Sequence, residues 1–342
     1  MKLGQWIGLL GLVSILYVLW QIRQMLLLLF AAIVLANSLN LLVQWLQQRK
    51  IKRSVAVSLS IGCFFTIMAG FFWLIVPPLE TQVEELIVLF PIGVNRVDGW
   101  LEQNINLVPE QFRSYAPTLE RIGQQLQPFL NQILGRSIPV FSALVGIAIN
   151  TLLVFVLALM LIIDPSPYRR LAIRLFPSFY RRRADATLNE CGEALGRWME
   201  AALISMSVIA VLSSLGLFVL GIRAALAQGV LAGLLNFIPN IGPTMSVVFP
   251  TAIALLDAPW KSVAVLIFYI LVQLFESNLL TPYIMAQHAA LLPAVTLLAQ
   301  IFFAVMFGPL GLALAIPLTV VGQIWIRNIL FEDLLDQWKH SE

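Results

Sequence analysis

Two long apolar stretches in the last third of the chain are each interrupted at their centre by residues that end helices. The first is interrupted by residues 236–243, with the sequence NFIPNIGP, and the second by residues 307–311, with the sequence FGPLG. In a lipid bilayer, backbone N–H and C=O groups that Pro and Gly release must find partners inside the protein. We therefore expect these segments to be buried in protein or to line an aqueous cavity, and two of them in comparable positions indicate the binding site of a secondary transporter.

The composition indicates a protein that crosses a membrane several times. Hydrophobic residues make up 60% of the chain and charged residues 11%, whereas soluble domains contain roughly 45–50% apolar and 25% charged residues. The formal net charge of +3 is too small and too dispersed for a nucleic-acid partner, which would need a basic stripe on a soluble face. The two Cys and two His residues have no disulfide or metal-ligand spacing, so we expect no metal site and no cofactor.

Six apolar stretches have the length of one membrane span, which is roughly 20 residues for a hydrocarbon core about 30 Å thick. They are residues 3–20, 25–45, 54–77, 139–163, 198–221 and 260–283. The two interrupted stretches, about residues 222–257 and 291–327, would each be roughly 54 Å long as single helices, which is too long for one crossing. Each is either a tilted broken helix or a re-entrant hairpin. The predicted fold is all-α, a polytopic membrane protein with about eight membrane segments, two of them broken or re-entrant.

The distribution of Lys and Arg predicts the orientation of these segments. A basic turn at residues 49–53 and a second basic region at residues 164–197 should face the cytoplasm, whereas the loop 78–138, with more acidic than basic residues, should lie outside. Both termini are then cytoplasmic. Hairpins and broken helices give the same termini but place Lys261 and His288 on opposite sides of the membrane, and the sequence leaves both possibilities open.

The predicted organisation has six parts. They are N-terminal spans (1–77), an extracytoplasmic loop of amphipathic helices (78–138), the fourth span (139–163), a basic cytoplasmic loop (164–197), a transport unit with both interrupted stretches (198–327) and a cytoplasmic tail (328–342). The outer loop is expected to be structural, with a substrate-capturing domain as the alternative. Within the basic loop, the stretch 168–183 is expected to contact anionic lipid headgroups.

Glu276 carries the clearest functional signal of any single residue. It lies in the apolar stretch 260–283, and a carboxylate inside a membrane segment is costly and therefore a functional hypothesis by default. Gln273, three residues earlier, lies on the same helical face and could hydrogen-bond to it. Asn278 and Pro282 complete the candidate site in this segment. The alternative is a Glu that only joins helices.

The first interruption supplies further candidate binding residues. Asn236 and Asn240 flank Pro239, so two side-chain amides lie where the helix unwinds, and a new helix is expected to start around Gly242. The free N–H groups of its first turn would form a partial positive pole for a polar or anionic solute. The alternative is a packing kink in which the amides cap backbone groups.

Gly308 and Gly311 are the candidate residues of the second interruption, where they offer backbone flexibility and close approach without a side chain. The chain has no phosphate-binding GxxxxGK[ST] loop and no HExxH motif, and the membrane segments hold no Ser/His/Asp or Cys/His constellation. We therefore expect no ATP hydrolysis, no enzymatic activity and no catalytic residues, so the energy for transport should come from an ion gradient.

Three motifs in this order resemble those of a known family. They are residues 237–243 (FIPNIGP), residues 273–282 (QLFESNLLTP) and residues 308–317 (GPLGLALAIP), with Leu292-Pro293 ahead of the last. Over nearly its whole length the chain is similar to the autoinducer-2 exporter family of membrane permeases. The resemblance implies an eight-segment transporter, with some members linked to export of autoinducer-2 and others to sodium/proton antiport. It also implies a homo-oligomer, with a pentamer as the suspected form, and an elevator-like mobile domain.

The chain departs from the family pattern close to the candidate site. Ala286 and Gln287 stand where the family usually has Gly and a basic residue, Leu292 stands where it often has His, and Asn240 stands where Tyr is common. These differences keep the identity of the substrate from being carried over from the family.

We therefore predict a secondary transporter of the bacterial inner membrane that exports a small polar or organic solute, driven by a proton or sodium gradient. Its expected partners are the solute, the coupling ion, membrane lipids and further copies of the chain. One alternative is a monovalent cation/proton antiporter that uses Glu276 as its carrier. A second alternative is a membrane scaffold that transports nothing.

Overall fold

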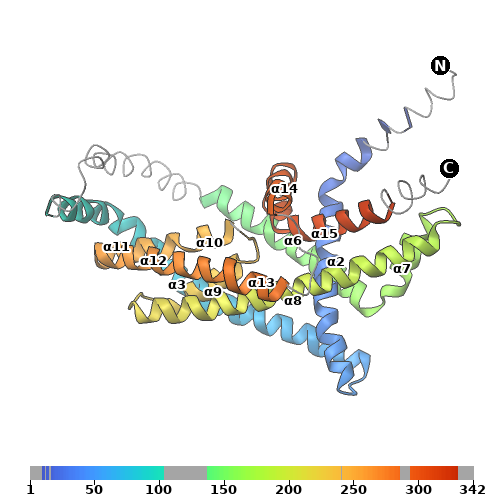
Figure 1. Cartoon of the computed structure of the whole chain (residues 1–342), viewed down its shortest axis with the longest axis horizontal. Helices are drawn as coiled ribbons and strands as arrows, with labels where there is room; N and C mark the ends of the chain where they lie inside the picture. The colour runs from blue at the N-terminus through green and yellow to red at the C-terminus, as the bar shows by residue number, and fades with distance from the viewer. Residues whose placement is uncertain are drawn as a thin grey trace. The chain divides into compact units, whose positions relative to one another are not determined.

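A computed structural model of the chain describes residues 10–11, 13–14, 17–103, 137–239, 241–285 and 293–329, and excludes the side chains of residues 79–148 and 284–293. These residues are almost entirely helical, and no strand occurs among them (Figure 1). The predicted all-α fold is therefore confirmed. Most of the predicted first span, residues 3–20, lies outside the described residues.

Five helices in the described part are long and apolar enough to cross a membrane, or six if a bent pair at residues 149–174 counts as one span. Helix α3 (Arg53–Gln103) is 51 residues long. It therefore continues from the predicted third span directly into the first amphipathic segment of the predicted outer loop, past Pro77 and Pro78. The remainder of that loop, residues 104–136, lies outside the described residues.

The chain forms two compact units. One consists of Met1–Phe64, Gly146–Glu200 and His288–Glu342, and the other of Phe65–Val145 and Ala201–Gln287. The division of the chain into a scaffold and a transport unit at residues 198–327 stays a prediction.

In the first unit, α2 (Arg23–Gln48) packs against α6 (Ser137–Ile163) through small residues. Ala32, Ala36 and Ala158 are buried together there. Small side chains of this kind allow helix backbones to approach closely in a membrane protein. One helical turn further on, Leu39 and Val43 pack with the start of α3 and the end of α6. The short turn between α2 and α3 holds residues 49–52 of the predicted basic turn, and Arg53 begins α3.

Helix α6 ends in a sharp bend. Asp164 caps α7 (Pro165–Arg174) by accepting a hydrogen bond of 3.2 Å from the backbone N–H of Ser166, and Pro165 occupies the first turn of α7. Pro favours the first turn of a helix because it has no N–H group, and the N–H groups of that turn have no partner within the helix. The axes of α6 and α7 are bent by 94° at this point.

The first unit also contains the N-terminal part of α8 (Arg181–Val219), α14 (Pro293–Ala313) and α15 (Ala315–Ile326). Gly308 interrupts α14 with φ 70° and ψ −153°, a backbone conformation that glycine adopts far more readily than other residues. The predicted interruption of the second apolar stretch is therefore present as a kink immediately before Pro309.

The second unit contains the first interrupted stretch, which forms three short helices. They are α9 (Ala225–Leu235), α10 (Ile241–Ser246) and α11 (Val248–Asp257). At 11 residues, α9 is roughly 16 Å long and cannot cross a bilayer core about 30 Å thick alone. The predicted interruption is present, while the choice between hairpin and broken span stays open.

Helix α9 lies closely against α8 in this unit. A Cβ atom added at Gly229 would lie 2.3 Å from the backbone nitrogen of Ser214, and one at Gly233 would lie 2.4 Å from the carbonyl oxygen of Met206. Helix α12 (Pro259–Phe275) covers the other side of the unit's apolar core, where Leu217, Ile253 and Val265 are fully buried or nearly so. This packing fixes the register of α12 against α8 and thereby positions the candidate site.

Candidate functional site

The side chain of Glu276 meets polar groups from two other segments of the second unit. Glu276 is half-buried at the end of α12, where it accepts a hydrogen bond of 3.4 Å on Oε1 from the hydroxyl group of Ser205 in α8. The same Ser205 oxygen accepts a bond of 3.0 Å from Nδ2 of Asn236, which ends α9. The Asn236 amide also lies within hydrogen-bonding reach of Glu276. A carboxyl, a hydroxyl and an amide group thus form one cluster.

Apolar packing places Ser205 opposite Glu276. Ile209, one turn after Ser205 in α8, packs against Val272 and Leu280, which lie one turn before and one turn after Glu276. Because residues four apart lie on the same helical face, the contact of Ile209 with both brings Ser205 to the carboxyl group. Ser205 was not among the residues singled out in the sequence, although it is a polar residue inside an apolar span.

Asn236 is the buried residue among the described polar residues of the predicted site. It is 6% exposed, and its Oδ1 atom makes no hydrogen bond within the described part of the chain. A buried carbonyl oxygen without a partner is costly, so this oxygen, beside the Ser205 hydroxyl and the Glu276 carboxyl, is available to a bound proton donor or cation.

The turn after Asn236 is closed by backbone hydrogen bonds. The N–H of Gly242 donates to the carbonyl of Ile238 at 2.8 Å, and the N–H of Ile241 donates to the carbonyl of Pro239 at 2.9 Å. A Cβ atom at Gly242 would lie 1.8 Å from the carbonyl oxygen of Leu235, so only glycine fits there. These two N–H groups are thus taken by the backbone instead of pointing at a solute. Asn240 lies outside the described residues.

A π-helix, η2 (Glu276–Leu280), begins at Glu276 itself and leads into α13 (Thr281–Met285). Pro282 accounts for it, because Pro has no N–H to donate and its ring would clash with the carbonyl four residues earlier. Single π-helical turns are frequent at functional sites.

The other predicted residues of this segment point elsewhere. Asn278 is exposed and donates from Nδ2 to the carbonyl of Leu274 at 2.9 Å. Gln273 is exposed, and in the described part of the chain its side chain makes no hydrogen bond to Glu276. The predicted partner of Glu276 on its own helix is therefore replaced by Ser205 from α8.

Gly308 and Gly311 lie in the first unit. At Gly311 an added Cβ atom would lie 2.3 Å from the carbonyl oxygen of Phe303. Gly311 therefore allows the helix to fold back closely after the kink at Gly308, which agrees with the predicted close approach of the backbone.

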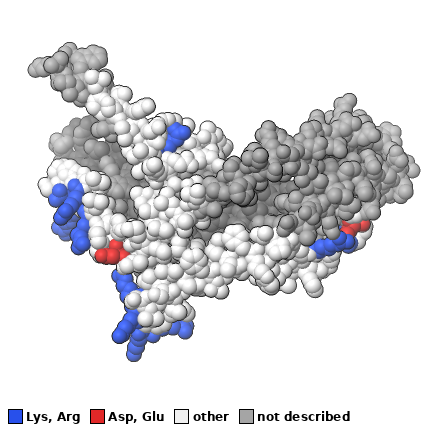
Figure 2. Space-filling view, turned by 180° about the vertical axis from the view of Figure 1, so that it is seen from behind, with Lys and Arg blue, Asp and Glu red and all other residues white. Residues whose placement is uncertain are grey.

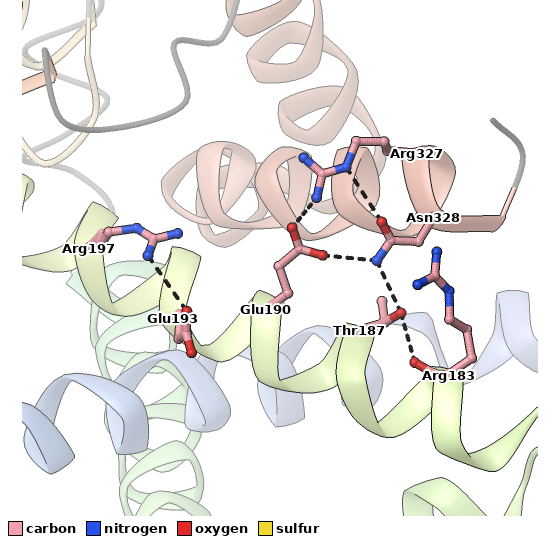
Figure 3. Close-up of polar contacts among 7 residues, drawn as sticks. All are labelled: Arg183, Thr187, Glu190, Glu193, Arg197, Arg327 and Asn328. Carbon is pink, nitrogen blue, oxygen red and sulfur yellow. Dashed lines mark hydrogen bonds and ion pairs between the residues drawn. The ribbon is translucent and has the colours of Figure 1, made fainter. Parts of the chain in front are cut away.

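The first unit holds a second polar cluster, which joins the N-terminal part of α8 to the residues that follow α15 (Figure 3). Arg327 donates from Nη2 to Oε1 of Glu190. Asn328 donates from Nδ2 to Oε2 of Glu190 at 2.9 Å and to the Thr187 hydroxyl oxygen at 3.1 Å. Thr187 and Asn328 are 1% and 4% exposed. The cluster is internally bonded and is best explained as a structural clamp; we call it the α8–α15 clamp.

Among the described residues, no group of three or more His, Cys, Asp or Glu side chains could hold a metal ion. The Ser205–Asn236–Glu276 cluster brings a carboxyl group, a hydroxyl group and an amide group together within the apolar segments of the second unit.

Comparison with known proteins agrees with this picture. The family model described as AI-2E family transporter matches residues 9–331. The candidate transport protein YhhT of Escherichia coli is 25% identical over 310 residues, which is 90% of this chain and 84% of that protein. The AI-2 transport protein TqsA of Escherichia coli is also 25% identical, over 87% of this chain and 84% of that protein. The candidate transport protein YueF of Bacillus subtilis is 24% identical, over 83% and 79%.

The family match confirms the resemblance inferred from the three sequence motifs, all of which lie inside the matched region. It extends over both compact units and over every helix described above. The chain therefore belongs to the AI-2E transporter family and is a membrane transporter that crosses the bilayer several times.

Proposed function

We propose that the chain is a secondary transporter that exports a small polar or organic solute, and that a proton or sodium gradient drives it through Glu276. The observation that carries this proposal is the hydrogen-bonded series Asn236, Ser205 and Glu276, which links an interrupted helix to a carboxyl group inside an apolar helix. An intramembrane carboxyl group is costly unless its ionisation is used or it is paired, and here its bonded partners are neutral groups.

The bonding pattern supports a coupling role. An ionised Glu276 accepts hydrogen bonds from Ser205 and Asn236, whereas a protonated Glu276 has a proton of its own to donate. When Glu276 is protonated, its own O–H can therefore donate to the hydroxyl oxygen of Ser205. The Ser205 hydroxyl can then donate to the buried Oδ1 of Asn236, which accepts no other hydrogen bond among the described residues. Since Asn236 ends α9, the charge of Glu276 would bias the conformation of the interrupted helix, as coupling requires.

The solute is proposed to be small and polar, like autoinducer-2. This rests on the family resemblance and on a relative that is named an AI-2 transport protein. The departures at Ala286, Gln287 and Leu292 leave room for a different solute of the same class.

Several further properties belong to the same proposal. The chain would lie in the bacterial inner membrane with both termini in the cytoplasm, act without enzymatic chemistry, and work as a homo-oligomer, with a pentamer as the suspected form, whose transport unit moves like an elevator. The resemblance supports the oligomer and the motion, and the Lys/Arg distribution supports the orientation.

A second candidate function is monovalent cation/proton antiport. It is favoured by the oxygen atoms of the cluster, because carboxylate, carbonyl and hydroxyl oxygens are the ligands that hard cations such as Na⁺ prefer. Oδ1 of Asn236 would then be a cation ligand beside the Glu276 carboxylate, and protons and Na⁺ would compete for the site.

Proteoliposomes containing the full chain test both functions. We would measure uptake of autoinducer-2 into these proteoliposomes under an imposed pH gradient, and Na⁺-dependent proton flux with an entrapped pH dye. Glu276→Gln should assemble normally and lose the response to the gradient in whichever assay the parent is active. The matched control is Glu193→Gln, which removes an exposed carboxylate of α8 and should leave transport unchanged.

The outcomes separate the hypotheses. Autoinducer-2 uptake would support the exporter, and Na⁺-dependent proton flux without uptake would support the antiporter. Absence of both would leave an exporter of a different solute and the non-transporting scaffold. A Glu276→Gln variant that still concentrates its solute against a gradient as well as the parent would show that Glu276 only joins helices.

A further inference from the structure

Helix α7 leaves the end of α6 at a large angle and exposes apolar side chains. The two helix axes are bent by 94°, so if α6 crosses the membrane, α7 lies close to the membrane plane. Tyr168, Leu171 and Leu175 are 39%, 65% and 82% exposed and follow one another at helical spacing. They form one apolar stripe along α7 that faces away from the rest of the first unit.

Contacts on the opposite side of α7 fix the direction of this stripe. Arg169 donates from Nε to a carboxylate oxygen of Asp185 at 2.8 Å. Phe176, just past the C-terminal end of α7, stacks on Trp325 of α15 with ring centroids 5.5 Å apart and an interplanar angle of 11°. Because both contacts lie on the protein-facing side, the apolar stripe cannot turn inward without breaking them.

A basic edge runs beside the apolar stripe. Arg170 and Arg174 are exposed, lie one turn apart on α7, and make no ion pair within the described part of the chain. Arg181 and Arg182, also exposed, begin the next helix. Figure 2 shows Lys and Arg side chains gathered in separate patches on an otherwise largely uncharged described surface. An exposed apolar stripe bordered by Arg is the pattern of a helix that lies in a membrane interface.

We propose that α7 lies in the membrane–water interface and binds acidic phospholipids, with Leu171 and Leu175 in the acyl-chain boundary and Arg170 and Arg174 on the lipid phosphates. Charge complementarity favours an acidic lipid surface over a neutral one, because the basic edge has no carboxylate partner within the described residues. Each Arg near such a surface strengthens binding about fivefold. This inference is independent of the proposed transport function.

The test measures the depth of α7 in the full chain reconstituted into liposomes. Cys63 and Cys191 are replaced by Ser and Ala, and single cysteines at Leu171 or Leu175 carry a nitroxide label. The collision rates of each label with oxygen, which concentrates in lipid, and with a water-soluble nickel chelate are compared. Liposomes of phosphatidylcholine alone are compared with liposomes containing one quarter phosphatidylglycerol.

We expect both labels to favour oxygen in the acidic liposomes. Arg170→Gln and Arg174→Gln should each lower the ratio of docked to undocked α7 about fivefold. The matched control is Arg197→Gln, which removes one exposed positive charge from α8 and should leave the ratio unchanged.

Three other results would overturn the proposal. Labels that favour nickel in both lipid mixtures would place α7 in water. Labels that neither reagent reaches would place it under another protein chain. Labels that favour oxygen equally in both mixtures would show an apolar contact that does not involve acidic headgroups.

Discussion

The α8–α15 clamp, formed by Thr187, Glu190, Arg327 and Asn328, makes a quantitative prediction about stability. Replacement of Asn328 by Ala removes the 2.9 Å bond to Glu190, the 3.1 Å bond to Thr187 and the long 3.5 Å bond that Oδ1 of Asn328 accepts from Nε of Arg327. A bond to a charged group contributes about 1.5–3 kcal/mol and a neutral bond about 0.5–1.5 kcal/mol, so loss of the bonds to Glu190 and Thr187 should cost roughly 2–4.5 kcal/mol. Thr187 keeps its own donated bond of 3.1 Å to the carbonyl of Arg183, so no buried hydroxyl is left without a partner.

The assay is thermal unfolding of the detergent-solubilised protein, followed by intrinsic fluorescence at several scan rates because unfolding of such proteins is often irreversible. We expect the apparent melting temperature of Asn328→Ala to fall by roughly 5 °C. The apparent melting temperature of Asn328→Asp should fall at least as far, because the new carboxylate would face that of Glu190. The matched control is Arg197→Ala, whose ion pair with Glu193 is exposed and 3.7 Å long and contributes about 0.5 kcal/mol or less. Equal melting temperatures for Asn328→Ala and Arg197→Ala would refute the reasoning.

Three further predictions concern the second unit, and the first of them has its control in α15. Gly242→Ala should prevent assembly, as judged by size-exclusion chromatography, because its Cβ atom would lie 1.8 Å from a backbone carbonyl oxygen. The control variant Gly322→Ala, at a position with open space around it, should assemble normally. Ser205→Ala should weaken gradient-driven transport in proteoliposomes, while Ser207→Ala, which loses only a 2.7 Å bond within its own helix, should not; equal activities would remove Ser205 from the site. A single cysteine at Lys261 should react with impermeant reagents from outside the cell if the first interrupted stretch is a hairpin, and from inside if it is a broken span.

The helix ends at both interruptions could be predicted from the sequence because they depend on local backbone chemistry. Pro239 cannot donate an N–H, and the turn that contains it separates α9 from α10. Gly308 adopts a positive φ, and α14 kinks there. The helical class followed from composition alone, since long apolar segments in a bilayer must satisfy their backbone groups internally.

The partners of the polar side chains could not be predicted in the same way, because they depend on packing between helices far apart in the sequence. Helix α8 carries four serines between residues 205 and 214, and only the contact of Ile209 with Val272 and Leu280 selects Ser205 as the one facing Glu276. Spacing along one helix favoured Gln273, which is exposed. Asn328 likewise lies 138 residues from Glu190, and no local pattern links the two.

Under the proposed coupling, the close packing around Gly242 explains how a change in the charge of Glu276 could move residues beyond its immediate neighbours. The N–H groups of Ile241 and Gly242 at the start of α10 donate to carbonyls of the turn that follows α9, and there is no space between Gly242 and the Leu235 carbonyl at the end of α9 for even a methyl group. A rearrangement of the Asn236 side chain therefore cannot be absorbed by loosening of this turn. Because packed segments shift as bodies and do not deform continuously, the change would have to move α9 against α8, where Gly229 and Gly233 already bring the two backbones into contact.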